Sequence, residues 1–364
     1  MALNRLLKLY YFYFDTLHSS IENKLTFVKD VILRKEKFRL KLRNGPTLIF
    51  TFHEIIQIQA WKKLLEYGIE VKRSGTLLEF FGFPVLQLSV DVSELNTKEF
   101  LNLVGLIFEC VKYGIKLSDF NRLGNFHFQD ENMKIDFHKK IIITPDGAKF
   151  ALGNIDPGIF SETYIQKIHN RLIGDFNKLT VLDVGANFGD TPIYFAKRGA
   201  IVWAIEPVKL NYEALIKNLA LNSELKVSVS KYAIGPLRNL VINSSTYSLD
   251  GSASGFYTKG HAINETVESL SVREFLKRKG LDQIDFLKMD CKGCERYLSQ
   301  DDLKCVKKYL HIEFDPYSST DDINNLIDLV NTAGFDYAIL NHNVEAGLGY
   351  GKNFGTIYAS RRLD

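Results

Sequence analysis

The segment Val181–Asp190, which reads VLDVGANFGD, constrains the fold more than any other part of the chain. An apolar run ends at Gly185, and Gly189 stands directly before a segment with helical character. A second apolar run ends at Glu206, 23 positions after Asp183 (206 minus 183). In nucleotide-binding sheets an acid at roughly this distance meets the ribose hydroxyls. The pattern therefore predicts strand, glycine loop, helix, strand and terminal acid, which together bind an adenosine ligand.

The glycine spacing favours S-adenosylmethionine over a dinucleotide. In Gly185-x-x-x-Gly189, Asn187 and Asp190 stand where a dinucleotide fingerprint has its second and third glycines. Asp190 would repel a pyrophosphate, whereas the sulfonium and ammonium groups of S-adenosylmethionine suit carboxylates such as Asp183 and Asp190. An ordinary turn between strand and helix and an NAD-dependent hydride-transfer site are the alternatives.

The length and composition indicate a globular protein of about two domains. The chain has 364 residues, of which 46% are apolar and 24% are charged. Its formal charge of +3 gives no general case for nucleic-acid binding, and we expect no nucleic-acid partner. We predict an N-terminal α+β region over residues 1–150, with substrate binding or oligomerisation as its open roles, and an α/β catalytic domain over residues 151–364.

The N-terminal 33 residues have apolar side chains at helical spacing, and their first turns are apolar all round. We expect a helix that packs against the protein or a partner subunit, while peripheral contact with a membrane and a homo-oligomer stay open. The apolar run Leu9–Phe14 is far shorter than the roughly 20 residues of a membrane span, and no signal peptide is evident. The expected location is cytoplasmic.

Further elements follow from turn signals and periodicity. Before residue 160 we predict helices over 53–67 and 98–112, strands around Ser74-Gly75, and hairpins that pair 37–42 with 47–52 and 140–144 with 149–152. Later strands alternate with helices, as in a parallel sheet, and we place them at 180–184, 201–205, 226–231, 283–289, 308–314, 335–340 and 355–360. The final two lack a long helix between them. This predicts a Rossmann-like, seven-stranded class I methyltransferase sheet with a late antiparallel pair.

Two of the four cysteines, Cys291 and Cys294, have the C-x-x-C spacing of redox and metal sites. They follow a predicted strand instead of opening a helix, and no second C-x-x-C exists. We therefore expect incidental small buried cysteines in a reducing compartment.

Four motifs make the chain similar to the FkbM-type family of S-adenosylmethionine-dependent methyltransferases. They are LDVGANFGD at 182–190, AIEP at 204–207, AIG at 233–235 and IDFLKMDCKGCE at 284–295. The last resembles the family signature K-x-D-x-E-G-x-E, and the resemblance covers roughly residues 140–360. It implies methyl transfer from S-adenosylmethionine, usually to a hydroxyl oxygen on a sugar, polyketide or related small molecule.

One position departs from that signature. Lys288, Asp290, Gly293 and Glu295 are retained, but Lys292 stands where the family commonly has Glu. The reversed charge puts the usual arrangement of base or substrate in doubt, and an anionic acceptor is one consequence.

Three carboxylates are candidate catalytic residues: Asp290, Glu313 and Glu295. Ligands in open α/β sheets lie at the carboxyl ends of the strands, which selects Asp290 after the fourth strand and Glu313 near the end of the fifth. Either could take a proton from a hydroxyl acceptor. Glu295 could contact substrate or pair with Lys288 or Lys292. His311 is expected to be a core histidine, and His342 is a lesser candidate base.

The expected cofactor is S-adenosylmethionine, and no metal is predicted. The residues expected along its methionine half are Asp183, Gly185, Ala186, Asn187 and Gly189, with Glu206 on the ribose and Tyr232 and Ala233 near the adenine. A divalent cation bridging Asp290, Glu313 and Asn341 is a less favoured alternative. The loop 250–255 is either a lid or a surface turn.

The function predicted from these observations is O-methylation of a sugar, glycan, lipid or other small-molecule acceptor. An RNA methyltransferase would use the same cofactor site, but the chain lacks an Asp/Asn-Pro-Pro-Tyr/Phe motif after the fourth strand. A non-catalytic binding protein that keeps the fold is the alternative from a different class.

Overall fold

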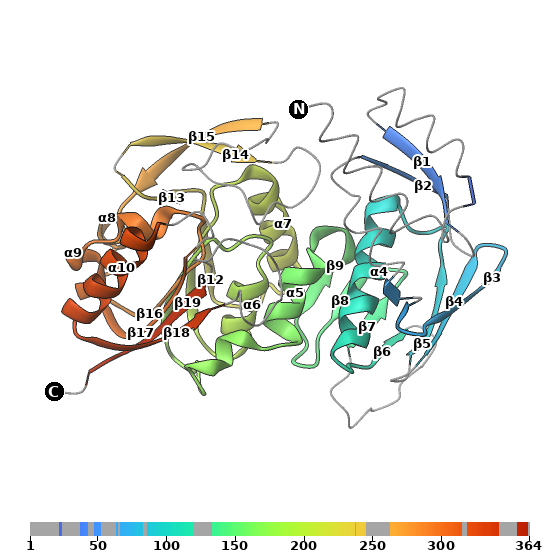
Figure 1. Cartoon of the computed structure of the whole chain (residues 1–364), viewed down its shortest axis with the longest axis horizontal. Coiled ribbons are helices and arrows are strands. Elements are labelled where there is room, and N and C mark those ends of the chain that lie inside the picture. The colour runs from blue at the N-terminus through green and yellow to red at the C-terminus, as the bar shows by residue number, and fades with distance from the viewer. Residues whose placement is uncertain are drawn as a thin grey trace. The chain divides into compact units, whose positions relative to one another are not determined.

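A computed structural model of the whole chain divides into two compact units, Met1–Gln166 and Lys167–Asp364 (Figure 1). It describes residues 22–23, 37–42, 47–51, 63–64, 66–82, 86–119, 133–236, 238–244, 263–314, 319–341 and 355–362. Outside these lie nearly all of the predicted N-terminal helix with its membrane contact, most of the predicted helix 53–67, the loop 250–255 and His342. The predicted domain boundary after residue 150 stays a prediction.

The first unit contains a hairpin and a seven-stranded sheet. The sheet has the order β3-β4-β5-β6-β7-β8-β9. The strands are β1 Lys37–Lys41, β2 Thr47–Thr51, β3 Glu70–Ser74, β4 Leu77–Gly82, β5 Leu86–Asp91, β6 Leu117–Asp119, β7 Met133–Asp136, β8 Ile141–Ile143 and β9 Lys149–Ala151. The antiparallel pairs β1·β2 and β8·β9 confirm both predicted hairpins, and β3·β4 confirms the strands around Ser74-Gly75.

A buried helix, α4 Thr97–Lys112, organises the first unit and confirms the helix predicted over 98–112. It begins with a capping box in which Asn96 and Glu99 each accept from the other's backbone N–H. Its buried Asn102 donates to the backbone carbonyls of Leu152 and Ile155, at the 3₁₀ turn η3 Leu152–Asn154. These bonds satisfy a polar side chain that burial would otherwise penalise. Helix α5 Pro157–Tyr164 packs beside α4.

The second unit is built on a seven-stranded sheet of the order β12-β11-β10-β16-β17-β19-β18. All neighbours are parallel except β19, which is antiparallel to both β17 and β18. The strands are β10 Thr180–Val184, β11 Ile201–Ile205, β12 Val227–Ser230, β16 Ile284–Met289, β17 Val306–Phe314, β18 Phe335–Asn341 and β19 Gly355–Arg361. The predicted class I methyltransferase sheet with its late antiparallel strand is confirmed.

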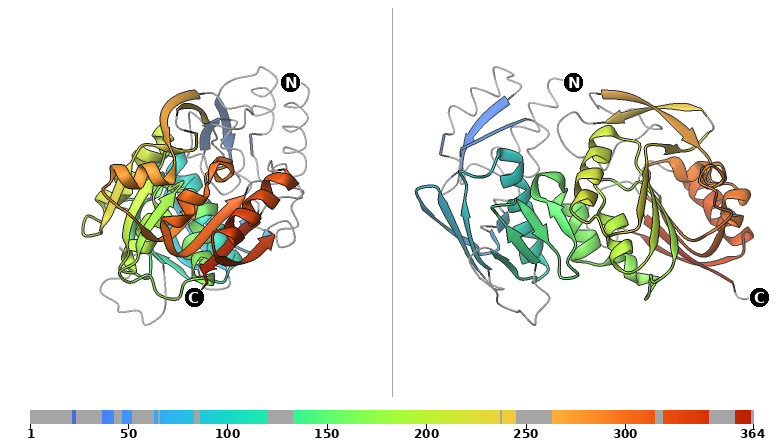
Figure 2. Two further views of the ribbon diagram at one scale, coloured as in Figure 1. Left: turned by 90° about the vertical axis from the view of Figure 1, so that its left-hand side faces the viewer. Right: turned by 180° about the vertical axis from the view of Figure 1, so that it is seen from behind.

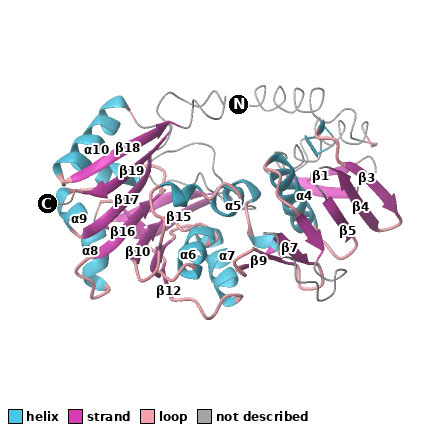
Figure 3. Ribbon diagram, turned by 90° about the horizontal axis from the view of Figure 1, so that it is seen from below, coloured by secondary structure: helices cyan, strands magenta, loops and turns pink. Residues whose placement is uncertain are grey.

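Helices cover both faces of this sheet (Figure 3). Figure 3 shows α8, α9 and α10 on one side and α6 and α7 on the other. All six residues of β16 are buried: Phe286 packs against Phe195 of α6, whereas Leu287 belongs to a core cluster with Phe275 of α8. Strands buried on both faces are typical of parallel sheets. The helices are η4 Ile168–Arg171, α6 Asp190–Lys197, α7 Lys209–Ala220, α8 Val272–Arg278, η5 Cys294–Tyr297, α9 Gln300–Lys304 and α10 Thr320–Thr332.

A three-stranded sheet in the second unit was not predicted. It has the order β13-β15-β14, from Ala233–Ile234, Ile263–Leu270 and Asn239–Ser244. Strands β14 and β15 form a ribbon set apart from the large sheet (Figure 2). Leu240 and Ile242 are buried while Val241 is 49% exposed, so burial alternates along β14 although the sequence there is a continuous apolar run without apolar/polar alternation.

Among the described residues, no helix combines the length and apolar character needed to cross a membrane.

Candidate active site

Backbone hydrogen bonds hold the glycine loop after β10 against the end of β11. The N–H groups of Gly185 and Ala186 both donate to the carbonyl of Ile205, at 3.0 Å. Gly185, Asn187 and Gly189 have φ values of 82°, 47° and 93°, which other residues adopt at a cost. A Cβ atom on Gly185 would lie 1.9 Å from the backbone oxygen of Asp290. Glycine at position 185 therefore lets the loop after β10 touch the loop after β16.

A buried ion pair lies beneath this loop. Lys288 Nζ is 3.1 Å from Asp183 Oδ1 and donates to the carbonyl of Gly185 at 3.0 Å, and the two charged side chains are 5% and 0% exposed. Thr191 donates to the other Asp183 oxygen at 2.5 Å. Burial lowers the pKa of Lys288, but Asp183, Asp290 and Asp190 outweigh it and raise that pKa above its usual value. Asp183 thus supports the loop from below.

Glu206 closes the loop from the end of β11. Its carboxylate accepts from the backbone N–H groups of Asn187 at 2.8 Å and Val208 at 2.9 Å. Burial raises the pKa of Glu206 to about 7 in spite of these bonds. Both Asn187 and Ser230, at the end of β12, have backbone hydrogen bonds to Glu206, and their buried Oδ1 and Oγ atoms have no hydrogen-bond partner among the described residues. Such atoms are suited to a polar ligand, because burial without a partner costs free energy.

The predicted adenine residues follow β12 directly. Ala233 is 6% exposed and pairs β13 with β15 through Ser269. The half-buried Tyr232 packs edge-on against Phe275, and the guanidinium of Arg278 lies 5.9 Å from its ring centroid. The two residues come shortly after Ser230, the last residue of β12, and so lie beyond the carboxyl end of that strand.

Asp290, Lys292 and Glu313 form a second charged cluster, at the ends of β16 and β17. Lys292 Nζ is 2.7 Å from Asp290 Oδ1 and also contacts Glu313 Oε1. The three side chains are 33%, 23% and 15% exposed, respectively, so the cluster reaches solvent. The structure brings together two predicted catalytic carboxylates and the residue that departs from the family signature.

The two carboxyl groups of the cluster have pKa values that are shifted in opposite directions. For Asp290, burial acts to raise the pKa, but the ammonium groups of Lys292 and Lys288 hold the pKa below its usual value. For Glu313, burial and the neighbouring Asp290 charge raise the pKa to about 7 despite Lys292. Two carboxyls with separated pKa values are a common arrangement at acid–base sites.

Lys292 also bears on two alternatives from the sequence. Its ammonium lies between Asp290 and Glu313, the two carboxylates that a bridging divalent cation would have used. Its charge is already offset by these carboxylates, which weakens the idea that it binds an anionic acceptor. The side chain of Asn341, the third proposed metal ligand, lies outside the described residues.

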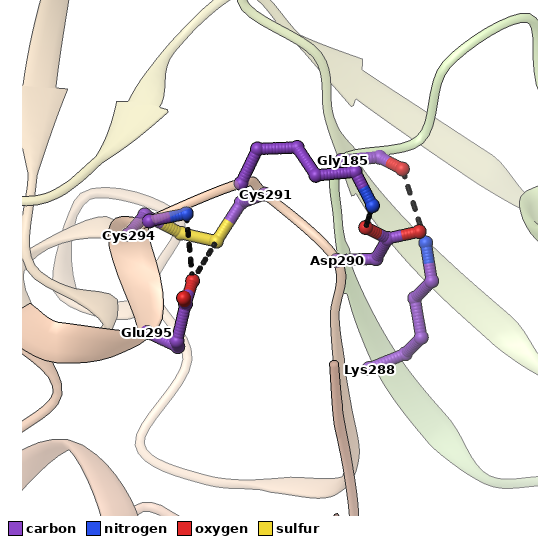
Figure 4. Close-up of a disulfide and its surroundings, with 8 residues drawn as sticks. Gly185, Lys288, Asp290, Cys291, Cys294 and Glu295 are labelled. Carbon is purple, nitrogen blue, oxygen red and sulfur yellow. Dashed lines mark hydrogen bonds and ion pairs between the residues drawn. A yellow bond between two sulfur atoms is a disulfide. The ribbon is translucent and has the colours of Figure 1, made fainter. Parts of the chain in front are cut away.

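The prediction of incidental cysteines is wrong, because Cys291 and Cys294 are joined in a disulfide. Figure 4 shows this bond in yellow between the two cysteines. The two residues between them, Lys292 and Gly293, have φ values of 52° and 114°. The expectation failed because C-x-x-C was judged by the helix-opening position of redox enzymes, whereas here two left-handed residues turn the chain directly after a strand and bring the sulfurs together.

Glu295 lies behind this loop. Its carboxylate accepts from the backbone N–H of Gly293 at 2.9 Å, and it lies 3.7 Å from Cys291 Sγ (Figure 4). The side chain is buried, at 2% exposed. Among the described residues, the one group of three metal-type ligands is Cys291, Cys294 and Glu295, of which two are already bonded to each other. A catalytic role for Glu295 stays a prediction.

His311 has the surroundings of a core histidine. It is 4% exposed on β17, its Nδ1 lies 3.4 Å from that of His169, and its ring packs against Tyr358. Burial lowers the pKa of His169 well below its usual value, so that imidazole is neutral at pH 7.

A hollow of about 210 Å³ lies beside η5 and α10. Glu295, Arg296 and Asp322 are among its lining residues, but none of the predicted cofactor residues lines it. We do not assign it to the cofactor.

Comparison with known proteins identifies the central part of the second unit. Residues 183–337 match the family described as methyltransferase FkbM domain. No curated protein matches the chain. Both the glycine loop and the Asp290–Lys292 segment lie within the matched residues.

Solved structures with similar folds include several methyltransferases. Precorrin-6y C5,15-methyltransferase from Geobacter metallireducens is 10% identical over 55% of this chain and 88% of that one, with a TM-score of 0.34. A fibrillarin pre-rRNA processing protein from Methanococcus jannaschii is 12% identical over 81% and 99%, with a TM-score of 0.36. An O-methyltransferase from Bacillus cereus in complex with SAH is 13% identical over 57% and 82%, with a TM-score of 0.34. We draw no conclusion about the acceptor from likenesses this distant.

Proposed function

We propose that this chain, whose residues 183–337 belong to the methyltransferase FkbM domain family, transfers a methyl group from S-adenosylmethionine to a hydroxyl oxygen. The acceptor is a sugar, glycan, lipid or other small molecule. The observation that carries the proposal is the contact between two loops: Gly185 meets the backbone of Asp290, so the loop for the donor adjoins the carboxylates for the acceptor.

The residues around the glycine loop fit the donor. Glu206 offers a buried carboxylate to ribose hydroxyls, and Asn187 Oδ1 and Ser230 Oγ, which have no partner within the described part of the chain, offer further polar contacts. Gly185, Ala186 and Gly189 let the ligand approach the backbone closely, and Tyr232 and Ala233 flank the adenine. Asp183 acts indirectly by fixing Lys288 beneath the loop. When bound, S-adenosylmethionine supplies a methyl group that its positively charged sulfur makes electrophilic.

Glu313 is the base in this proposal. A general base works best when its pKa lies near the working pH, and burial brings the pKa of Glu313 to about 7. Asp290 has its pKa held below the usual value, so it stays charged and orients the hydroxyl as an acceptor of hydrogen bonds. Lys292 holds both carboxylates in place. As the hydroxyl oxygen gains the methyl group, its proton passes to the Glu313 carboxylate.

Trapping the methylated product tests the proposal. The purified protein would be incubated with S-adenosylmethionine labelled in its methyl group and with cell extract, and the label would then be followed into lipid, glycan, small-molecule and nucleic-acid fractions. We expect label in one of the first three fractions, and prior nuclease treatment should not change its amount. Degradation of the labelled product should yield a fragment that carries the label as a methyl ether. Label that disappears after nuclease treatment would establish the RNA methyltransferase instead.

Calorimetry with S-adenosylhomocysteine separates an enzyme from a non-catalytic relative of the fold. We expect binding with a Kd in the micromolar range, corresponding to about −8 kcal/mol. Absence of binding by a folded protein would contradict the proposal.

A further inference from the structure

The disulfide Cys291–Cys294 closes the loop that carries Lys292. The two cysteines are three positions apart, and Lys292 and Gly293 are the residues between them. Lys292 has a φ of 52°, a left-handed backbone conformation that residues other than glycine rarely adopt. The bond therefore restricts the backbone at the position from which the Lys292 side chain departs.

The direction of that side chain determines the charged cluster. From its left-handed position, Lys292 reaches Asp290 on its own loop and Glu313 at the end of β17. A change of φ at Lys292 would move the start of a four-carbon side chain and withdraw its ammonium from at least one carboxylate.

We propose that Cys291–Cys294 is a redox-active site, and that its reduction releases Lys292 from Asp290 and Glu313. The effect on methyl transfer rests on the proposed function, whereas the change at Lys292 does not. The reductant that reacts with this disulfide is a dithiol, such as a protein with two neighbouring thiols.

The exposure of the two cysteine residues gives the order of events. Cys291 is half-buried while Cys294 is 2% exposed, so the reductant thiolate attacks Cys291 Sγ. The Cys291–Cys294 bond breaks, and Cys294 leaves as a thiolate and takes up a proton. The second thiol of the reductant then attacks the mixed disulfide, so that the reductant leaves as its own disulfide and Cys291 as a thiol. Two electrons pass from the reductant to the cysteine pair.

Glu295 is placed to accept a hydrogen bond in the reduced state. Its Oε2 atom lies 3.7 Å from Cys291 Sγ and also holds the N–H of Gly293. Reduction gives Cys291 an S–H group that can donate to this oxygen, so the buried carboxylate serves both redox states.

The reactivity of Lys292 toward an acylating reagent tests this inference without an acceptor. Wild-type protein would be prepared oxidised and after treatment with dithiothreitol, both with a chelator present to exclude metal, and brief acylation would be quantified for each lysine by peptide mass spectrometry. Lys304, whose side chain is 69% exposed, is the internal reference. We expect reduction to raise Lys292 acylation at least about fivefold relative to Lys304, because release of an ion pair frees the amine.

Two variants complete the experiment. C291S/C294S should show the high Lys292 reactivity with or without dithiothreitol, whereas Cys305→Ser, which alters a cysteine outside the disulfide, should respond as wild type does. Equal Lys292 acylation in the oxidised and reduced wild-type protein, or free Cys291 and Cys294 thiols in protein prepared without reductant, would overturn the inference. A redox-dependent Lys292 in a protein that transfers no methyl group would instead sink the proposed function and leave this one standing.

Discussion

The Asp183–Lys288 pair and the Asp290–Lys292–Glu313 cluster combine the same kinds of charge in different surroundings. The first is 0% and 5% exposed and lies beneath the glycine loop. The second is 15–33% exposed and faces solvent at the ends of β16 and β17. A buried pair offers no oxygen to an acceptor, whereas the partly exposed cluster can exchange a proton with one. The difference teaches that position along a strand decides whether a charged residue supports the fold or takes part in the reaction. Lys288 is the last residue but one of β16 and supports the glycine loop, whereas Asp290 follows the end of β16 and can meet the acceptor.

The largest effect is expected when the buried pair is broken. Asp183→Asn leaves the Lys288 ammonium without its carboxylate at a site closed to water, and we expect a loss of about 3–5 kcal/mol in the free energy of unfolding. Urea denaturation measures it. The double variant D183N/K288M should recover part of the loss because it also removes the buried charge. A single variant as stable as wild type would mean that the pair is not structural.

Removal of the proposed base tests the exposed cluster. Glu313→Gln keeps the size of the side chain but cannot take a proton, so we expect kcat to fall by about 100-fold while the Kd for S-adenosylhomocysteine stays unchanged. Steady-state kinetics on the trapped acceptor and calorimetry provide the two values. A loss of cofactor affinity with kcat intact would transfer Glu313 from the acceptor to the donor side.

The third prediction uses pH to sharpen the comparison. Because Glu313 must be deprotonated to act and its pKa is about 7, kcat/KM should rise with pH through about 7 in the wild type. Lys292→Met removes a positive charge that lowers the pKa of Glu313, so the midpoint should move upward by about one pH unit, with about a tenfold lower kcat/KM at pH 6. Lys304→Met, far more exposed and paired with Asp301, is the control. An unshifted midpoint would exclude Glu313 as the titrating base.

The smallest effect concerns Glu206. Glu206→Gln keeps one oxygen acceptor but loses charge toward the ribose, and we expect about a fivefold higher Kd for S-adenosylhomocysteine, about 1 kcal/mol. Glu224→Gln, at a carboxylate that is 60% exposed, should bind as wild type does. Equal affinity of the Glu206 variant would assign this carboxylate to the loop alone.

The sequence was enough to predict the large sheet because its signals are local. The strands 180–184 and 201–205 agree residue for residue with β10 and β11, where apolar runs end at a glycine and at an acid. The late antiparallel strand followed from the missing helix between the last two strands. The β13-β15-β14 sheet was not predicted because Leu240, Val241 and Ile242 form a short apolar run without apolar/polar alternation, and only the folded chain leaves Val241 exposed.

The candidate site was predicted only as a set of positions. Asp290 and Glu313 were expected to lie together because parallel strands end at one edge of a sheet, and the structure has them joined through Lys292. The role of Lys292 could not be predicted, because it depends on the left-handed backbone at Lys292 itself and on the carboxylate of Glu313, 21 positions away. The disulfide depends on the same local turn, for which the sequence offers Gly293 as its one signal.

The contact between Gly185 and the Asp290 carbonyl has a consequence for protein engineering. With 1.9 Å between that oxygen and a would-be Cβ atom, neither loop can be rebuilt alone. A redesign that seeks a new acceptor by lengthening or shifting the segment after β16 would push on the donor loop at its narrowest point. Changes in acceptor preference are therefore best sought in side chains beyond this contact, with the backbone at position 290 left where it is.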